Sequence, residues 1–256
     1  MLAYQSNTLG RLVVIVLLLS LLSGCLEWLR AYQTYLQLND FHRNFAIDAS
    51  DDFTLLFKDP KLLSKDFVAL SKLQPSESKP LSVGKRWRYW FKKVDGQGGV
   101  VQPEINFFFD LKFNPLDRLT AWTFSPLFLQ IAPAEFLEVS LRSIAGAEIN
   151  QEKKQLRAKS DLIEKIAAKL PLKSDVVAQL GEPLEIINEN EVEIYRYHFM
   201  LQTPFIEPGY EDRALNAVRL SFDLKTHELI KMSGRFAGLK VSINYRNYLE
   251  NDPDAI

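Results

Sequence analysis

Alternating apolar and polar residues predict antiparallel strands in the second half of the chain. Between Val192 and Met200, every second side chain points to one face, and the side chains between them point to the other. One of the two faces is more apolar, which is typical of a sheet packed on one side only. The same kind of pattern predicts strands over residues 193–201, 217–224, 228–236 and 241–245.

The first half shows a similar succession of elements. A helix is predicted near residues 27–41, with one side formed by Leu29, Tyr32, Leu36 and Asn39. A second helix is predicted over residues 62–73, and strands are predicted over 45–47, 53–57, 86–94, 105–113 and 118–124. In the second half, the helices predicted before the strands cover 134–145, 161–170 and 174–180.

Three pairs of segments indicate that one pattern occurs twice. Residues 65–70 resemble 174–180, residues 87–91 resemble 195–199, and Phe109-Asp110-Leu111 matches Phe222-Asp223-Leu224. The order is kept, and a repeat of this length indicates duplicated domains rather than a solenoid. We therefore predict an α+β protein with two tandem related domains, each with helices packed on a small antiparallel β-meander. Their predicted bounds are 25–132 and 133–250, with a tail over 251–256.

The N-terminus predicts export and membrane attachment. Leu12 to Leu22 is an apolar run of 11 residues, which is short for a membrane-spanning helix and typical of a signal-peptide core. The run ends in Leu22-Ser23-Gly24-Cys25, and Cys25 is the only cysteine. One cysteine excludes an internal disulfide and a multi-thiolate metal site.

The segment Leu22-Ser23-Gly24-Cys25 resembles the lipobox of bacterial lipoproteins. The resemblance implies a signal peptide over residues 1–24, cleavage before Cys25, and lipid on the Cys25 thiol as a membrane anchor. Leu26, where an aspartate would retain such a protein in the inner membrane, implies the outer membrane, facing the periplasm. An uncleaved signal anchor is the alternative, although Glu27 and Arg30 interrupt its extension.

A second resemblance concerns the second half. Residues 172–183, which end in Leu180-Gly181-Glu182-Pro183, and the strand Tyr195-Arg196-Tyr197-His198-Phe199 are similar to the BamE/SmpA-OmlA family, which has a β-lactamase-inhibitor-protein-like fold. The first half departs from the family motif at Ser71-Lys72-Leu73-Gln74-Pro75. The resemblance covers about 50 residues and implies an envelope domain that binds other proteins.

Motifs for catalysis and cofactor binding are missing from the sequence. His42, His198 and His227 have no metal-ligand spacing, and no phosphate-binding or nucleophile motif is present. The net charge of −1 and the lack of a basic stripe give no reason to expect nucleic-acid binding. We therefore expect no enzyme, no cofactor and no metal. Asp110 and Asp223 are interpreted as turn or edge residues, with acid–base chemistry as the alternative.

Aromatic residues are the remaining candidates for function. The predicted interaction surface consists of Trp87, Tyr89, Phe107, Phe109, Tyr195 and Tyr197. Arg88 and Arg196 stand among them, and a cation–π or cross-strand role is expected for both. The predicted function is a non-enzymatic envelope lipoprotein that binds a partner protein, with outer-membrane assembly or maintenance as one process it would serve. The alternative is a carrier or sensor of lipid or another apolar ligand.

Overall fold

The computed structural model describes residues 26–50, 52–144, 148–150, 155–157, 164–236 and 239–250. The predicted signal peptide, Cys25 and the tail over 251–256 lie outside the described residues.

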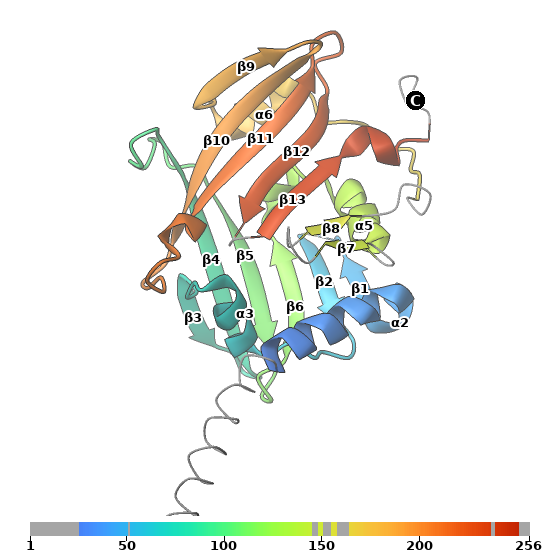
Figure 1. Ribbon diagram of the computed structural model, residues 1–256, viewed down its shortest axis with the longest axis vertical. Coiled ribbons are helices and arrows are strands. Elements are labelled where there is room, and N and C mark those ends of the chain that lie inside the picture. Colours follow the sequence, from blue (N-terminus) through green and yellow to red (C-terminus); the bar gives the residue numbers. More distant parts are fainter. Residues whose placement is uncertain are drawn as a thin grey trace, which may run out of the picture.

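Strands from both halves of the chain join in one antiparallel sheet of 11 strands (Figure 1). Its main path runs β1-β2-β6-β5-β4-β10-β11-β12-β13, while β3 pairs with β4 and β9 pairs with β10. The strands of the first half are β1 (Phe45–Asp48), β2 (Phe53–Phe57), β3 (Glu77–Pro80), β4 (Lys85–Val94), β5 (Asn106–Phe113) and β6 (Leu119–Phe124). Those of the second half are β9 (Glu185–Glu189), β10 (Val192–Gln202), β11 (Leu215–Asp223), β12 (Leu229–Phe236) and β13 (Leu239–Asn244). A separate hairpin contains β7 (Glu148–Asn150) and β8 (Gln155–Arg157).

The helices are short. Within the described ranges, the longest covers residues 26–37 and continues into η1 (Leu38–Asp40) and α2 (Phe41–Asn44). The others are α3 (Ser64–Ser71), α4 (Pro126–Leu129), α5 (Ala134–Ser143), α6 (Lys173–Leu180), η3 (Glu211–Arg213) and η4 (Tyr245–Tyr248).

The pairing of β4 with β10 makes the predicted fold class wrong. Residues 90–94 of β4 pair with residues 198–202 of β10, so the meander of the first half continues directly into that of the second. The protein is therefore one curled antiparallel sheet, and not two tandem domains with helices packed on separate small sheets. Each meander would otherwise end in an exposed edge at this place, and the pairing satisfies the backbone groups of both edges.

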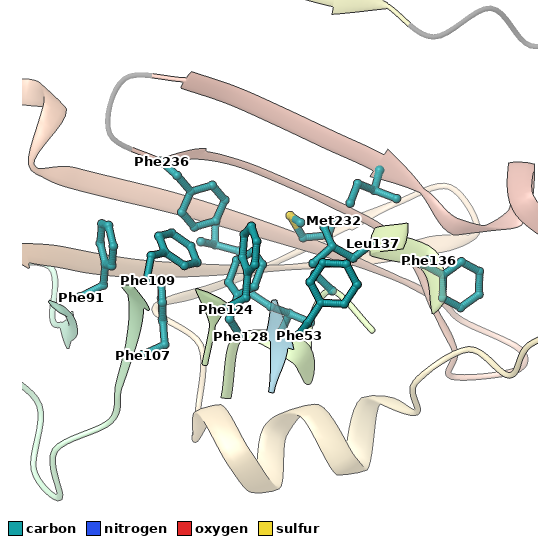
Figure 2. Packing of buried hydrophobic residues seen from close by; sticks show 14 of the residues in the cluster. Phe53, Phe91, Phe107, Phe109, Phe124, Phe128, Phe136, Leu137, Met232 and Phe236 are labelled. Atoms are coloured by element: carbon teal, nitrogen blue, oxygen red, sulfur yellow. The ribbon is translucent and has the colours of Figure 1, made fainter. Parts of the chain in front are cut away.

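The sheet curls around an aromatic core. Side chains at alternate positions of the strands turn to the inner face, as strand geometry requires. Phe236 of β12 thereby reaches Phe107 and Phe109 of β5, with ring centroids 6.2 Å apart in both pairs (Figure 2). Phe128 of α4 also contacts all three rings, and Phe136 of α5 packs on Tyr245. Helix α4 thus packs on the part of the inner face formed by Phe107, Phe109 and Phe236.

Matching local geometry occurs in both halves of the sheet. Glu77 pairs with Arg88 in the β3–β4 ladder, and Glu185 pairs with Arg196 in the β9–β10 ladder. Both residues of the second pair lie 108 positions after those of the first, so the two pairs occupy corresponding places. Both β5 and β11 also have a register shift next to their last residues. Arg88 faces Asp110 across the ladder and Arg196 faces Arg219. The register therefore matches Asp110 with Arg219, so the sequence alignment of Asp110 with Asp223 was wrong.

Most strands predicted from the alternation are confirmed, including β2, β4 and β10. Of the helix predicted over 161–170, residues 164–170 are described; they are not helical, and Ile166 forms an isolated bridge with Leu249. Three strands, β3, β7 and β9, were not predicted.

Candidate functional site

The six aromatic residues predicted as an interaction surface lie on the inner face of the sheet. Tyr89, Phe107, Phe109, Tyr195 and Tyr197 are at most 7% exposed, and Trp87 is partly buried against the same core. These residues cannot form an exposed surface. Phe107 and Phe109 instead contact Phe236 of the second half, and Phe107 also contacts Phe199. Burial also raises the pKa of the Tyr89 and Tyr197 hydroxyls.

The outer face of the sheet carries a different group of side chains, which the structure brings together. We call it the Arg88 cluster; it consists of Glu77 on β3, Arg86, Arg88 and Trp90 on β4, and Phe108 and Asp110 on β5. The residues alternate with the buried aromatics along the same strands, so the strands that build the core also hold this cluster.

Arg88 is the centre of the cluster. Its Nε and one terminal nitrogen donate to the two carboxylate oxygens of Asp110, both at 2.7 Å. The guanidinium lies 3.7 Å from the ring centroid of Phe108 and 4.9 Å from that of Trp90. Hydrogen bonding to Asp110 raises the pKa of Arg88. The expected cross-strand and cation–π roles of Arg88 are thus confirmed.

Glu77 holds the aromatic part of the cluster in place. The indole Nε1 of Trp90 donates to Glu77 Oε1 at 2.9 Å, and this hydrogen bond lowers the pKa of the carboxyl group. Trp90 packs edge to face on Phe108, with centroids 5.1 Å apart. Arg86 lies between the two carboxylates, 3.8 Å from Asp110 and 3.9 Å from Glu77. The cluster is therefore a charge-balanced, ordered plate of aromatic and guanidinium groups.

The second half provides an internal comparison. At the positions that match Trp90, Phe108 and Asp110 by register, it has His198, Ala217 and Arg219. Arg196 retains only a cross-strand ion pair with Glu185, at 2.7 Å. The same sheet geometry therefore forms without the aromatic plate, so the plate is not a requirement of the strand register.

No protein-family model matches the chain, and no curated protein or solved structure matches it either.

The other candidate residues lie apart. His42 contacts Arg142, His198 lies on the outer face of β10, and His227 occupies a turn with φ of 60°. Within the described part of the chain, no group of three or more histidine, cysteine, aspartate or glutamate side chains could hold a metal ion. The same residues include no helix that is long and apolar enough to cross a membrane.

Asp223 closes the turn after β11, whereas Asp110 pairs with Arg88 across two strands. The Oδ1 of Asp223 accepts hydrogen bonds from the backbone N–H groups of Lys225 and Thr226, and Oδ2 accepts one from Arg246. The bond from Thr226 is the main reason that its pKa is lowered. The interpretation of Asp223 as a turn residue is confirmed, whereas Asp110 is the partner of Arg88.

Proposed function

We propose that this chain is a lipid-anchored protein of the bacterial envelope that binds another protein through the Arg88 cluster. The anchor rests on the segment Leu22-Ser23-Gly24-Cys25 and the apolar run before it. The binding role rests on one observation: Arg88, Trp90 and Phe108 form an ordered, partly buried plate on the outer face of the sheet. Tryptophan and arginine are the side chains that most often dominate the energy of protein interfaces, and an ordered plate loses little entropy on binding.

The resemblance of the second half to the BamE/SmpA-OmlA family supports the same class of function. It implies an envelope domain that binds other proteins, while Leu26 after the lipobox favours the outer membrane, facing the periplasm. The aromatic face that motivated the alternative, a carrier of lipid or another apolar ligand, packs against α4 and α5 (Figure 2).

The anchor predicts a specific mass. The protein extracted from its own membranes should lack residues 1–24 and carry acyl chains, and a Cys25→Ala variant should lose both changes. Intact mass spectrometry of the two proteins measures this directly. An unmodified full-length mass for the wild-type protein would contradict the lipid anchor and favour an uncleaved signal anchor.

The binding role predicts that cluster substitutions weaken partner capture. Phe108→Ala and Trp90→His introduce the residues that the second half has at the matching positions. Each should weaken partner binding about tenfold or more, because side chains at interface hot spots contribute about 2 kcal/mol or more. The measurement is quantitative cross-linking in detergent-solubilised envelopes, followed by titration of the captured partner. Melting temperatures establish that the variants are folded.

Arg196→Ala is the matched control, because Arg196 occupies the place of Arg88 in the second half. It should leave capture unchanged. Equal capture by the wild-type protein, Phe108→Ala and Trp90→His would exclude the Arg88 cluster as the binding surface.

A further inference from the structure

The helix over residues 26–37 attaches to the rest of the protein through polar groups. Arg30 donates to both carboxylate oxygens of Asp66 in α3, at 2.7 and 2.5 Å. Directly before η1, the side chain of Gln37 donates to the backbone oxygen of Asp59 at 2.8 Å. The side of the helix that faces the sheet and α3 is thus held by an ion pair and a hydrogen bond.

The opposite side of this helix is apolar and exposed. Trp28, Leu29, Tyr32 and Leu36 lie on this side, with exposed fractions from 43% for Leu36 to 60% for Trp28. Leu26, in the first turn, is also 49% exposed. Tyr35 stacks on Tyr32 and extends the aromatic part. A surface helix of a globular domain normally turns its apolar stripe to the core and its polar face to water. Here the arrangement is reversed, so the apolar side requires a neighbour outside the fold.

The sequence before the helix indicates what this neighbour is. Leu26 directly follows Cys25, and the apolar run from Leu12 ends three residues before Cys25. A lipidated Cys25 and an uncleaved anchor would both attach the chain to a bilayer at this point. The first turn of the helix is therefore within reach of the membrane surface under either interpretation of the N-terminus.

Two turns lie at the same end of the molecule. The β3–β4 and β5–β6 turns lie beside the start of this helix (Figure 1) and are tied together by the ion pair Lys85–Asp117, at 2.6 Å. Ser64 of α3 donates to Asp117 at 2.7 Å, which connects the turns to the helix pair. The tips of the turns expose Val83 (66%) and Leu116 (74%). Apolar side chains from three separate segments are thus exposed at this end.

We propose that helix 26–37 lies along the bilayer surface and inserts its apolar side into the boundary between headgroups and acyl chains. This inference rests on the membrane anchoring proposed above and adds a second contact that fixes the orientation of the protein. Tryptophan and tyrosine are enriched at this depth, and amphipathic helices bind there through leucine and aromatic side chains. The tips of the β3–β4 and β5–β6 turns then face the membrane as well, and the Arg88 cluster stays in the aqueous phase.

Trp28 is the natural probe of this contact. The full chain, extracted with its anchor, is reconstituted into vesicles of phosphatidylethanolamine and phosphatidylglycerol with brominated acyl chains. Bromine quenches a tryptophan that reaches the acyl chains, so the wild-type protein should lose part of its emission relative to ordinary vesicles. This loss should disappear in Trp28→Phe and persist in the matched control Trp90→Phe. A Leu29→Asn/Leu36→Asn variant should show less quenching at an unchanged melting temperature.

Flotation of the vesicles separates the two proposals. Protein that floats with the vesicles but shows equal emission in brominated and ordinary lipid would overturn the helix contact and leave the anchor intact. Such a result would assign the apolar side to a protein partner instead. Protein that does not float would overturn the anchor itself, and with it the helix contact.

Discussion

Replacing Phe107 with alanine is expected to lower the free energy of unfolding by about 3–5 kcal/mol, the usual cost of removing a buried phenylalanine. Phe107 is 1% exposed, stacks on Phe91 at 4.9 Å and packs on Phe199 at the same distance. It also contacts Phe128 and Phe236, so its ring touches β4, β10, α4 and β12 together. Chemical denaturation followed by circular dichroism measures the change.

The neighbouring substitution Phe108→Ala is the control. Phe108 points to the outer face and is only partly buried, so its loss should cost clearly less than that of Phe107. Because one sheet contains both halves, Phe107→Ala should shift a single cooperative transition. Two transitions, of which the substitution shifts only one, would contradict the view that the β4–β10 pairing couples the halves.

The strands could be predicted from the sequence because alternation is a local signal. Residues 192–200 show their two faces directly, and the structure buries Tyr197 and Phe199 completely. The pairing of β4 with β10 could not be predicted in this way, because alternation tells which face is buried and not which strand lies alongside. Two similar meanders fit separate sheets and one joined sheet equally well.

Two of the missed strands, β3 and β9, have a common cause. Glu77–Pro80 and Glu185–Glu189 are mostly exposed, so neither shows a buried side at every second position. They are held by backbone pairing with β4 and β10, respectively. A strand that contributes little to a core has little hydrophobic pattern to detect.

The candidate site was misplaced for a related reason. The sequence has aromatic residues on both faces of β4 and β5, and the choice of Tyr89 and Phe109 selected the buried face. The signal that would have identified the outer face is charge, since Arg88 and Asp110 share it with Trp90 and Phe108. Charged side chains at alternate positions mark the face away from the hydrophobic core, and the aromatics between them are partly buried rather than core residues.

Arg30→Met is expected to cost about 3 kcal/mol, because it leaves the Asp66 carboxylate buried without its cation. The side chain of Asp66 is 1% exposed, whereas that of Arg30 is 19% exposed, so water relieves only part of this cost. Their hydrogen bonds are also the first cause of the raised pKa of Arg30. The expected loss of stability is measurable by denaturant unfolding of the full chain in detergent.

A double-mutant cycle with Asp66→Asn tests whether the pair itself is responsible. Asparagine keeps an oxygen for the backbone N–H of Leu63, which donates to Asp66 at 2.8 Å, and removes the buried charge. The double variant should therefore be more stable than Arg30→Met alone, with an interaction free energy of about 1–3 kcal/mol between the two positions. Strictly additive losses would mean that Arg30 contributes through its aliphatic stem, and that the helix over residues 26–37 is held to α3 by packing rather than by charge.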